Sequence, residues 1–370
     1  MILRELTLKN FRVFSEITIQ FKDGINIITG MNGQGKSSIL ESIYYLALTR
    51  SFRTNSDKSV IQYSSKSFDA RGKFFSSKGK TITVRIYFSE SEGKNVFLRD
   101  KRISSYSEFI GLIPCVVLSL SDTKLVYGGP SERRKFMDIL LSQTSPLYLE
   151  DLKKYKRTLF QRNTLLLSGN IKMIKDQLPS WNKQLIDSGS AIIMRRLSFV
   201  SFLNEHLSSY YYKLANINSD IKSMYYSSSG SLQEDCSNEH IKLAFDASLA
   251  RLSGREIEKR TTLAGPHRDD ILLFHNHKVF KEYSSQGETK TLIIALKLLE
   301  WEYVRNHRQI NPILLLDDIF GELDTERMKG LLHFVRSVGQ SFITTTLTNK
   351  FELSDTDTIF SVNDQKVYHA

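Results

Sequence analysis

A glycine-rich loop constrains this chain more than any other stretch. It fits the pattern G-x-x-x-x-G-K-[ST] of a phosphate-binding loop and reads Gly30-Met31-Asn32-Gly33-Gln34-Gly35-Lys36-Ser37. A short apolar strand at 25–28 precedes the loop, and apolar residues recur at helical spacing after it. This order directs backbone N–H groups and a helix N-terminus at phosphate oxygens. The sequence therefore predicts an α/β nucleotide-binding core.

The loop predicts ATP and Mg²⁺ as cofactors. We expect Lys36 to reach the β- and γ-phosphates and to be needed for catalysis, and the Ser37 hydroxyl to ligate Mg²⁺. The other predicted nucleotide contacts of this region are Gly30, Met31, Asn32, Gly33, Gln34, Gly35 and Ser38.

A second segment supplies the acidic half of such a site. The apolar run at 313–316 ends in Asp317 and Asp318. We expect Asp317 to hold Mg²⁺ and Asp318 to polarise the attacking water. The next apolar-to-polar strand, 341–346, places Thr345 where a γ-phosphate sensor would lie. Ligands bind at this carboxyl edge in open α/β sheets.

Composition narrows the class of partner. The 370 residues carry 51 Lys and Arg against 40 Asp and Glu, a formal net charge of +11, which favours a polyanion such as nucleic acid. The two cysteines, Cys115 and Cys236, cannot form a disulfide framework in a chain of this size, which indicates a reducing compartment. No apolar run approaches the roughly 20 residues of a membrane span. We expect a soluble, cytoplasmic protein.

The chain divides by pattern into a head and an insert. Alternating residues predict a hairpin at 1–21 and an antiparallel sheet within 54–110. Helical spacing dominates 147–255, with a loop at 216–238. We predict a discontinuous ATPase head, 1–146 with 256–370, and a helical arm, 147–255. Gly169, Pro179 and Gly189 interrupt the heptads that a sustained coiled coil needs.

Several local features allow two interpretations. The basic turn at 49–53 either is solvated or faces phosphates. The tyrosines at 210–212 and 225–226 either stack on bases or, as we favour, belong to a core or interface. His267, in the segment 265–270, suggests a metal or catalytic set, but a polar turn with one ion pair is the favoured reading. Ser131 is the expected N-cap of the helix that follows.

Ser285 and Gly287 stand immediately before a predicted helix, 289–306. A serine there is a weak signal alone, because many N-caps look like it. Between a phosphate loop and an acidic strand, however, the pair resembles the signature of ABC-type ATPases. That signature contacts the γ-phosphate held by another subunit, so Ser285 is predicted to act in trans. Asp324, at the end of the segment 321–324, matches their dimer-contact loop.

The resemblance then extends along nearly the whole chain. The sequence resembles the RecF family of bacterial recombination-repair ATPases, which is related to the SMC proteins. Arg12 and Arg53 lie in two of the shared segments and are predicted nucleotide contacts. The segments are 8–12, the phosphate loop, 51–53, 129–134, 161–163, 265–270, 285–288 and 316–318.

The resemblance implies a function. A RecF-like protein binds single-stranded and double-stranded DNA at gaps, forms a homodimer with ATP, and hydrolyses ATP slowly with stimulation by DNA. It acts with RecR and RecO to load RecA, and it supports replication restart and the SOS response. The fold expected is an ABC-type ATPase core with an antiparallel β subdomain and a short helical arm.

Two departures and two alternatives accompany this reading. The segment 119–122 and Lys290 differ from the usual family residues. A transporter cassette is the main alternative, but its signature would lie on the order of 100 residues after the loop lysine, whereas here 285 − 36 = 249. A structural protein with a vestigial nucleotide site is disfavoured by the complete set Lys36, Ser37, Asp317 and Asp318.

Overall fold

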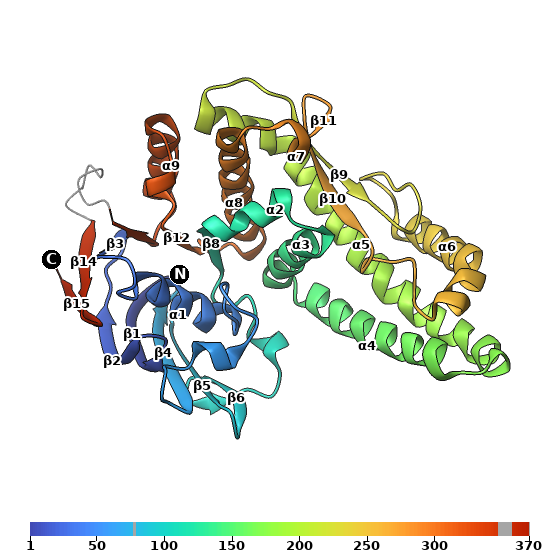
Figure 1. Cartoon of the computed structure of the whole chain (residues 1–370), viewed down its shortest axis with the longest axis horizontal. Coiled ribbons are helices and arrows are strands. Elements are labelled where there is room, and N and C mark those ends of the chain that lie inside the picture. Colours follow the sequence, from blue (N-terminus) through green and yellow to red (C-terminus); the bar gives the residue numbers. More distant parts are fainter. Residues whose placement is uncertain (77–78, 347–356, 370) are drawn as a thin grey trace. The chain divides into compact units, whose positions relative to one another are not determined.

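The computed structural model describes residues 1–76, 79–346 and 357–369 (Figure 1). The chain forms two compact units. The head unit comprises 1–122, 213–216 and 290–370, and the helical unit comprises 123–212 and 217–289. The helical unit therefore extends beyond the arm predicted for 147–255. It takes in 123–146 and 256–289, which pack with the helices of the arm.

A sheet of six described strands carries the head unit, in the order β15-β14-β3-β13-β12-β8. All neighbours except the β14–β15 pair are parallel. β3, β8 and β13 are buried throughout, as expected for parallel strands that are covered on both faces. The strands are β3 (Ile25–Thr29), β8 (Cys115–Ser119), β12 (Ile313–Asp317), β13 (Ser341–Thr345), β14 (Thr358–Asn363) and β15 (Lys366–His369).

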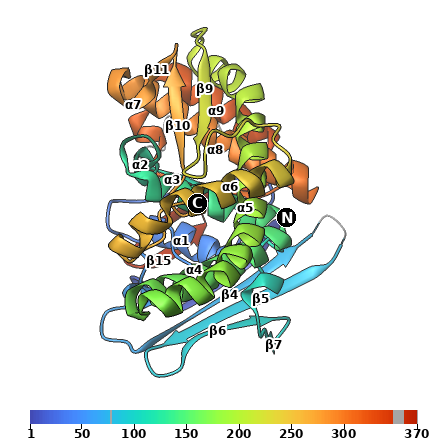
Figure 2. The ribbon, with the colours of Figure 1, turned by 90° about the vertical axis from the view of Figure 1, so that its right-hand side faces the viewer.

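A second, antiparallel sheet of the head unit has the order β2-β1-β4-β5-β6-β7. Figure 2 shows its strands β4, β5, β6 and β7. The N-terminal hairpin and the strands expected within 54–110 thus share one sheet. These strands are β1 (Ile2–Phe11), β2 (Phe14–Gln20), β4 (Ser67–Phe75), β5 (Thr81–Ser89), β6 (Gly93–Leu98) and β7 (Lys101–Arg102).

Helix α1 (Lys36–Leu48) joins the two sheets of the head unit. It contacts β1, β4 and β5 of the antiparallel sheet and β8, β12 and β13 of the parallel sheet. Every residue of α1 except Ser37 is buried, which explains why its apolar residues are not confined to one stripe. The head unit also contains α9 (Thr325–Ser337), most of α8 (Gln286–Arg308) and short 3₁₀ turns at Asp57–Val60, Tyr106–Glu108 and Phe320–Glu322.

The helical unit is built on a long helical hairpin (Figure 1). Helix α4 (Pro146–Ser168) ends at Gly169, and α5 runs unbroken over Ile171–Ala215. Pro179 and Gly189, which were expected to interrupt coiled-coil heptads, lie inside α5 and do not break the helix. Burial of apolar residues such as Leu178 and Leu185 along the helix outweighs their local cost of about 1–3 kcal/mol.

The remaining elements of the helical unit surround this hairpin. Gly129, rather than Ser131, is the N-cap of α3, because Pro130 occupies the first helical position. The elements are α2 (Lys124–Tyr127), α3 (Pro130–Thr144), α6 (Asn238–Lys259), α7 (Phe280–Tyr283) and a small antiparallel sheet of β9 (Ile221–Tyr226), β10 (Asp270–His275) and β11 (Lys278–Val279).

Burial resolves the tyrosine clusters residue by residue. Tyr211 and Tyr225 are buried in the core of the helical unit, as favoured, whereas Tyr212 and Tyr226 are about half exposed, at 50% and 57%. Across the described ranges, no helix combines the length and the apolar character that crossing a membrane requires.

Candidate nucleotide site

The phosphate loop leaves β3 and enters α1, as the sequence predicted. Gly35 is the N-cap of α1, with a φ of 109° that a residue with a side chain rarely adopts. A Cβ at Gly35 would also lie 2.6 Å from Cγ2 of Val13 and 2.7 Å from Cζ of Phe14. The loop therefore passes directly against the β1–β2 turn, and only glycine fits there.

Lys36 points back over the loop. Its Nζ donates to the carbonyl oxygens of Gly30, at 2.7 Å, and Met31, at 3.0 Å. Burial lowers the pKa of Lys36, while the charges of Asp318 and Asp317 act in the opposite direction. The ammonium group is thus held near the acidic pair and can exchange two neutral carbonyl partners for phosphate oxygens.

The acidic pair ends β12 and is organised by Thr344. The Thr344 hydroxyl donates to Oδ1 of Asp317, at 2.8 Å, and accepts from the Asp318 N–H, at 2.9 Å. Asp318 has a φ of 53°, a conformation uncommon for non-glycine residues and concentrated at functional sites. The backbone is thereby turned so that Asp318 faces the cavity described next.

Thr345, the predicted γ-phosphate sensor, follows Thr344 and is the last residue of β13. Its side chain is buried, and it projects from the face of β13 opposite to that of Thr344, since successive strand residues alternate. The sensor role of Thr345 stays a prediction. Thr344 was missed because its pairing with Asp317 depends on the β12–β13 register.

A cavity of about 390 Å³ opens beside the loop. Three cationic side chains, Arg12, Lys36 and Arg53, line it together with one carboxylate, Asp318, so its described lining carries a positive surplus that suits an anion. The predicted residues that it brings together are Arg12, Asn32, Gly33, Gly35, Lys36, Ser37, Ser38, Arg53 and Asp318.

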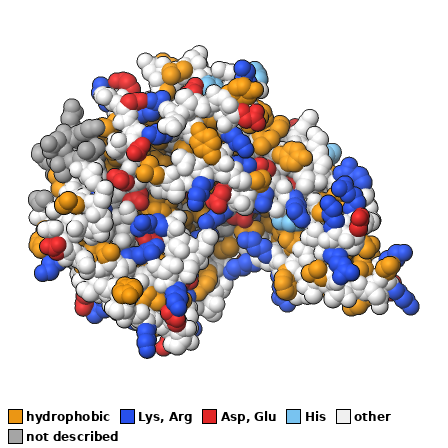
Figure 3. All heavy atoms as spheres, viewed as in Figure 1, with side chains coloured by type: hydrophobic (Ala, Val, Ile, Leu, Met, Phe, Trp, Pro, Cys, Tyr) orange, Lys and Arg blue, Asp and Glu red, His pale blue; other side chains and the backbone are white. Residues whose placement is uncertain are grey.

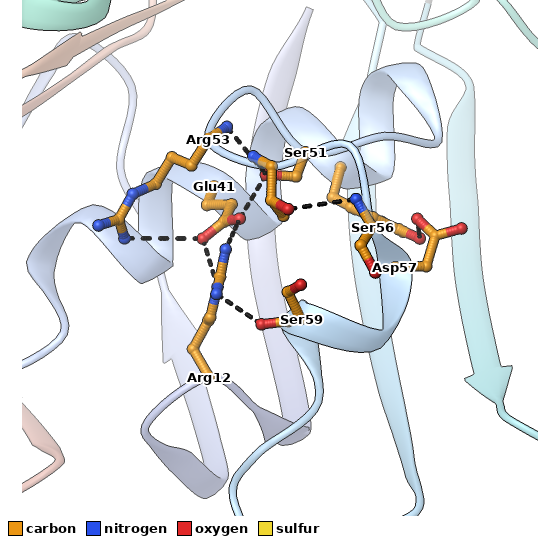
Figure 4. Close-up of polar contacts among 9 residues, drawn as sticks. Arg12, Glu41, Ser51, Arg53, Ser56, Asp57 and Ser59 are labelled. Atoms are coloured by element: carbon orange, nitrogen blue, oxygen red, sulfur yellow. Dashed lines mark hydrogen bonds and ion pairs between the residues drawn. The ribbon is translucent and has the colours of Figure 1, made fainter.

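A buried carboxylate, Glu41, pairs with the two arginines that line the cavity (Figure 4). Glu41, on α1, is fully buried and accepts from Arg12 Nε, at 2.8 Å, and Nη2, at 2.6 Å. Arg12 Nη1 also donates to the Ser59 carbonyl, at 2.5 Å. Ser51 Oγ donates to Glu41, and Arg53 Nη1 lies 3.8 Å from Glu41 Oε2. Glu41 thus fixes the Arg12 guanidinium while holding Arg53 more loosely.

The basic turn at 49–53 therefore faces the cavity through Arg53, although the Arg53 side chain is 46% exposed. The turn is closed by Ser51 Oγ, which accepts from the N–H groups of Arg53, at 2.9 Å, and Thr54, at 3.0 Å. Glu41 was missed by the sequence reasoning. Its signal is a single charged residue within the largely apolar run 39–48.

Three predicted loop residues, Gly30, Met31 and Gln34, do not line the cavity. A Cβ at Gly30 would lie 2.4 Å from the Val362 carbonyl oxygen, so the loop packs against β14. Gln34 Oε1 accepts from the Asp364 N–H, at 2.9 Å. Met31 is 77% exposed.

Ser285 and Asp324 cap helices. Ser285 Oγ accepts from the Glu288 N–H, at 3.2 Å, and the Ser285 N–H donates to Glu288 Oε2, at 2.8 Å, which is a reciprocal capping box at the start of α8. Ser285 is nevertheless exposed. Asp324 Oδ1 accepts from the Arg327 N–H, at 3.0 Å, and this bond lowers the pKa of Asp324. Both residues are held in fixed positions at helix starts.

The segment 265–270 forms a buried polar hub in the helical unit. Arg133 binds Asp270 through Nε, at 2.8 Å, and Nη2, at 2.7 Å. His267 bonds Tyr155, and desolvation lowers its pKa to about 4, so its ring is neutral. No group of three metal-ligating side chains occurs among the described residues. The favoured reading, a polar turn with an ion pair, describes this segment better than a metal set.

Comparison with known proteins decides the family. The family model described as RecF/RecN/SMC N terminal domain matches residues 2–369. The chain is 35% identical to the DNA replication and repair protein RecF of Prosthecochloris aestuarii, with 98% of this chain and 99% of that protein covered. It is 34% identical to RecF of Bacillus cereus strain G9842, with 98% and 97% covered.

The chain belongs to the RecF family. Solved structures of the recombination mediator protein RecF in the RecFOR pathway agree in fold. The structure described as RecF-ATP superposes with a TM-score of 0.92 at 30% identity, covering 100% of this chain and 97% of that one. The structure described as RecF-ATPrS gives 0.90 at 29% identity, with 100% and 98% covered. An SMC head bound to a ScpA domain, at 16% identity and a TM-score of 0.54, shares the fold alone. Membership of the RecF family decides against the transporter-cassette alternative.

Proposed function

We propose that the chain is an ATP-dependent DNA-binding switch of recombinational repair. One observation carries the proposal: the phosphate-loop Lys36, the acidic Asp318 and two arginines line a single cavity. A triphosphate suits the positive surplus of this cavity. The relatives described as RecF-ATP and RecF-ATPrS support ATP as the ligand.

Within this site the chain's own residues have distinct roles. Lys36 and Arg12 bind and orient the phosphates, and Asp318 accepts a hydrogen bond from the attacking water and aligns it. Ser37 and Asp317 offer the hard oxygen ligands that suit Mg²⁺, which would neutralise phosphate charge when bound. Asp318 is one methylene shorter than the glutamate of transporter cassettes, which favours slow hydrolysis.

Dimerisation completes the site in this proposal. The sequence contains one phosphate loop, and Ser285 is exposed at the start of α8. Ser285 and Gly287 of one protomer would contact the γ-phosphate held by the other, with Asp324 at the same interface. ATP then joins two protomers, and hydrolysis separates them.

DNA and repair proteins are the proposed partners. Lysine and arginine side chains are spread over the face drawn in Figure 3, and the net charge is +11. Family membership supports the proposal of single-stranded and double-stranded DNA at gaps, RecR and RecO, and through them RecA, as partners. It also supports a proposed cytoplasmic location and proposed roles in replication restart and the SOS response. DNA affinity should fall steeply with rising salt, because released counterions drive phosphate contacts.

Asp318→Asn tests the hydrolytic part of the proposal. The variant should bind ATP as tightly as the wild type but turn it over about 100-fold more slowly, because the amide cannot act as a base. Asp364→Asn is the control, since only the Asp364 backbone N–H contacts the loop, through Gln34. Unchanged turnover in Asp318→Asn would remove Asp318 from its assigned role.

A further inference from the structure

The helical unit contains a cavity of its own, of about 270 Å³. Its lining comes from α3, α4, α5 and the turn that precedes β10. Three of the lining side chains are cationic, Arg134, Lys156 and Arg196, and one is a carboxylate, Asp138. No function has yet been assigned to this cavity, which lies in a different unit from the phosphate loop.

Asp138, the carboxylate of this cavity, already has hydrogen-bond partners within the protein. Asp138 Oδ1 accepts from Arg196 Nη2, at 2.8 Å, and from the Tyr148 hydroxyl, at 2.6 Å. Arg196 is 2% exposed, and its Nη1 also donates to the Pro266 carbonyl, at 2.8 Å. Asp138 and Arg196 therefore balance one another in charge.

Arg134 and Lys156 are the two cations of this lining that do not pair with Asp138. Neither forms an ion pair within 4.0 Å with any residue that the structure describes. Arg134 Nη1 donates to the backbone oxygen of Asp269, at 2.8 Å, which carries no charge to balance the guanidinium. Desolvation, and then the neighbouring Arg196, lower the pKa of Arg134, while the charges of Asp270, Asp269 and Asp138 act in the opposite direction. An anion in the cavity would contact this partly buried guanidinium directly, which adds to the stabilisation that the more distant carboxylates give it.

The rest of the lining is neutral. His267 Nε2 lies 3.2 Å from the Thr262 carbonyl oxygen, which can only accept, so Nδ1 accepts from the Tyr155 hydroxyl at 2.6 Å. Leu152, Leu159 and Ile192 form an apolar wall. The cavity thus combines two cations that form no direct ion pair, the partly buried Arg134 and the exposed Lys156, with an apolar surface that can cover a planar ring.

We propose that this cavity binds a phosphate-bearing ligand about the size of one nucleotide. The Arg134 fork and the Lys156 ammonium suit a phosphate group, and the apolar wall suits a base. The volume lies just below the range of about 300–1,000 Å³ typical of ligand pockets, so the ligand is small. The same chemistry is offered by a free nucleotide or by one nucleotide of a DNA strand.

The test uses the full-length chain with Lys36→Ala, which weakens the phosphate loop as a competing anion site. Deoxyadenosine monophosphate is titrated by calorimetry, and a short fluorescein-labelled DNA single strand by anisotropy. Lys156→Glu is compared with Lys154→Glu, a matched charge reversal on the same helix at a residue that is exposed, as Lys156 is, but lies outside the cavity. Thermal unfolding checks that both variants fold.

Lys156→Glu should weaken binding by about tenfold or more, and Lys154→Glu by much less, because only the first reverses a charge in the cavity. Saturable binding of the mononucleotide with this pattern indicates a free nucleotide, and binding of the strand alone indicates DNA. Equal losses in the two variants, or no saturable binding of either probe, would overturn the proposal. Neither result depends on ATP at the phosphate loop, so failure here leaves the proposed ATPase intact.

Discussion

The nucleotide pocket of the head unit and the polar hub of the helical unit use the same chemical pair for opposite purposes. In each, two nitrogens of one arginine donate hydrogen bonds to one carboxylate: Arg12 to Glu41, and Arg133 to Asp270. Arg12 stands on the wall of an open cavity. Both guanidinium groups also donate through Nη1 to a backbone carbonyl, Arg12 to that of Ser59 and Arg133 to that of Gly128, at 2.7 Å, but Arg133 lines neither of the two cavities described above.

The difference shows that an arginine–carboxylate pair is not by itself a sign of function. What separates the two is whether the guanidinium still faces a space that a ligand can enter. Substitutions in the pocket should therefore change nucleotide affinity with little effect on the free energy of unfolding. Substitutions in the hub should lower the free energy of unfolding with little effect on nucleotide affinity.

Lys36→Ala should produce the largest effect. Removal of the ammonium deletes at least two charge-assisted bonds to phosphate, at about 2 kcal/mol each, and should weaken ATP binding roughly 1,000-fold. The measurement is calorimetric titration with ATP, alongside urea unfolding of the free protein. A large loss of stability with unchanged affinity would reverse the comparison.

Asp270→Asn should act on folding instead. It leaves the Arg133 guanidinium, only 12% exposed, without its counter-ion, so the unfolding free energy should fall by about 3 kcal/mol. Urea unfolding measures the change. ATP affinity, measured where the variant is folded, should match that of the wild type, and a weakened affinity would contradict the separation of the two regions.

His267 should make the hub sensitive to acid. Its pKa is about 4 in the folded chain and 6.5 when unfolded, so between these values the unfolded state binds more protons. This contribution to stability is present above pH 6.5 and is lost as the pH falls towards 4. Between pH 7 and pH 5 the wild type should lose about 2 kcal/mol more than His267→Gln. Parallel pH profiles of the two proteins would show that His267 is not buried neutral.

Glu41→Gln should give the smallest change, about a tenfold weaker affinity for ATP, because the amide holds the Arg12 fork less firmly. If Glu41 acts through Arg12, the substitution should have little further effect in an Arg12→Ala background. Asp69→Asn is the control, since Asp69 pairs with Arg85 at 2.7 Å within the antiparallel sheet and lines no part of the cavity. Additive losses in the double variant would reduce Glu41 to a structural role.

The sequence predicted what is encoded locally. The phosphate loop was predictable because a strand, glycines, a lysine and a helix start follow one another within the segment 25–48. The acidic end of β12 was predictable from an apolar run that stops at two carboxylates. Ser285 before α8 was also visible, and the capping role raised as the alternative for it is what the structure shows, with Glu288 three residues later.

Contacts between distant segments were not predictable. The hydrogen bond from Thr344 to Asp317 depends on the register of two parallel strands. The pairing of Arg12 with Glu41 depends on the packing of α1 against β1. Pro179 and Gly189 were expected to interrupt coiled-coil heptads, but that expectation did not show that the helix itself runs through both residues. Their local cost is outweighed by the core around α5, whose composition comes from several segments.

The central claim is that ATP completes the site by joining two protomers, and sizing in solution tests it most directly. Analytical ultracentrifugation should show monomers without nucleotide and dimers with ATP. Ser285→Arg, which still has an intact phosphate loop, should bind ATP and remain monomeric. A Ser285→Arg protein that dimerises with ATP as readily as the wild type, or a wild type whose turnover per protomer is the same at every dilution, would contradict the account.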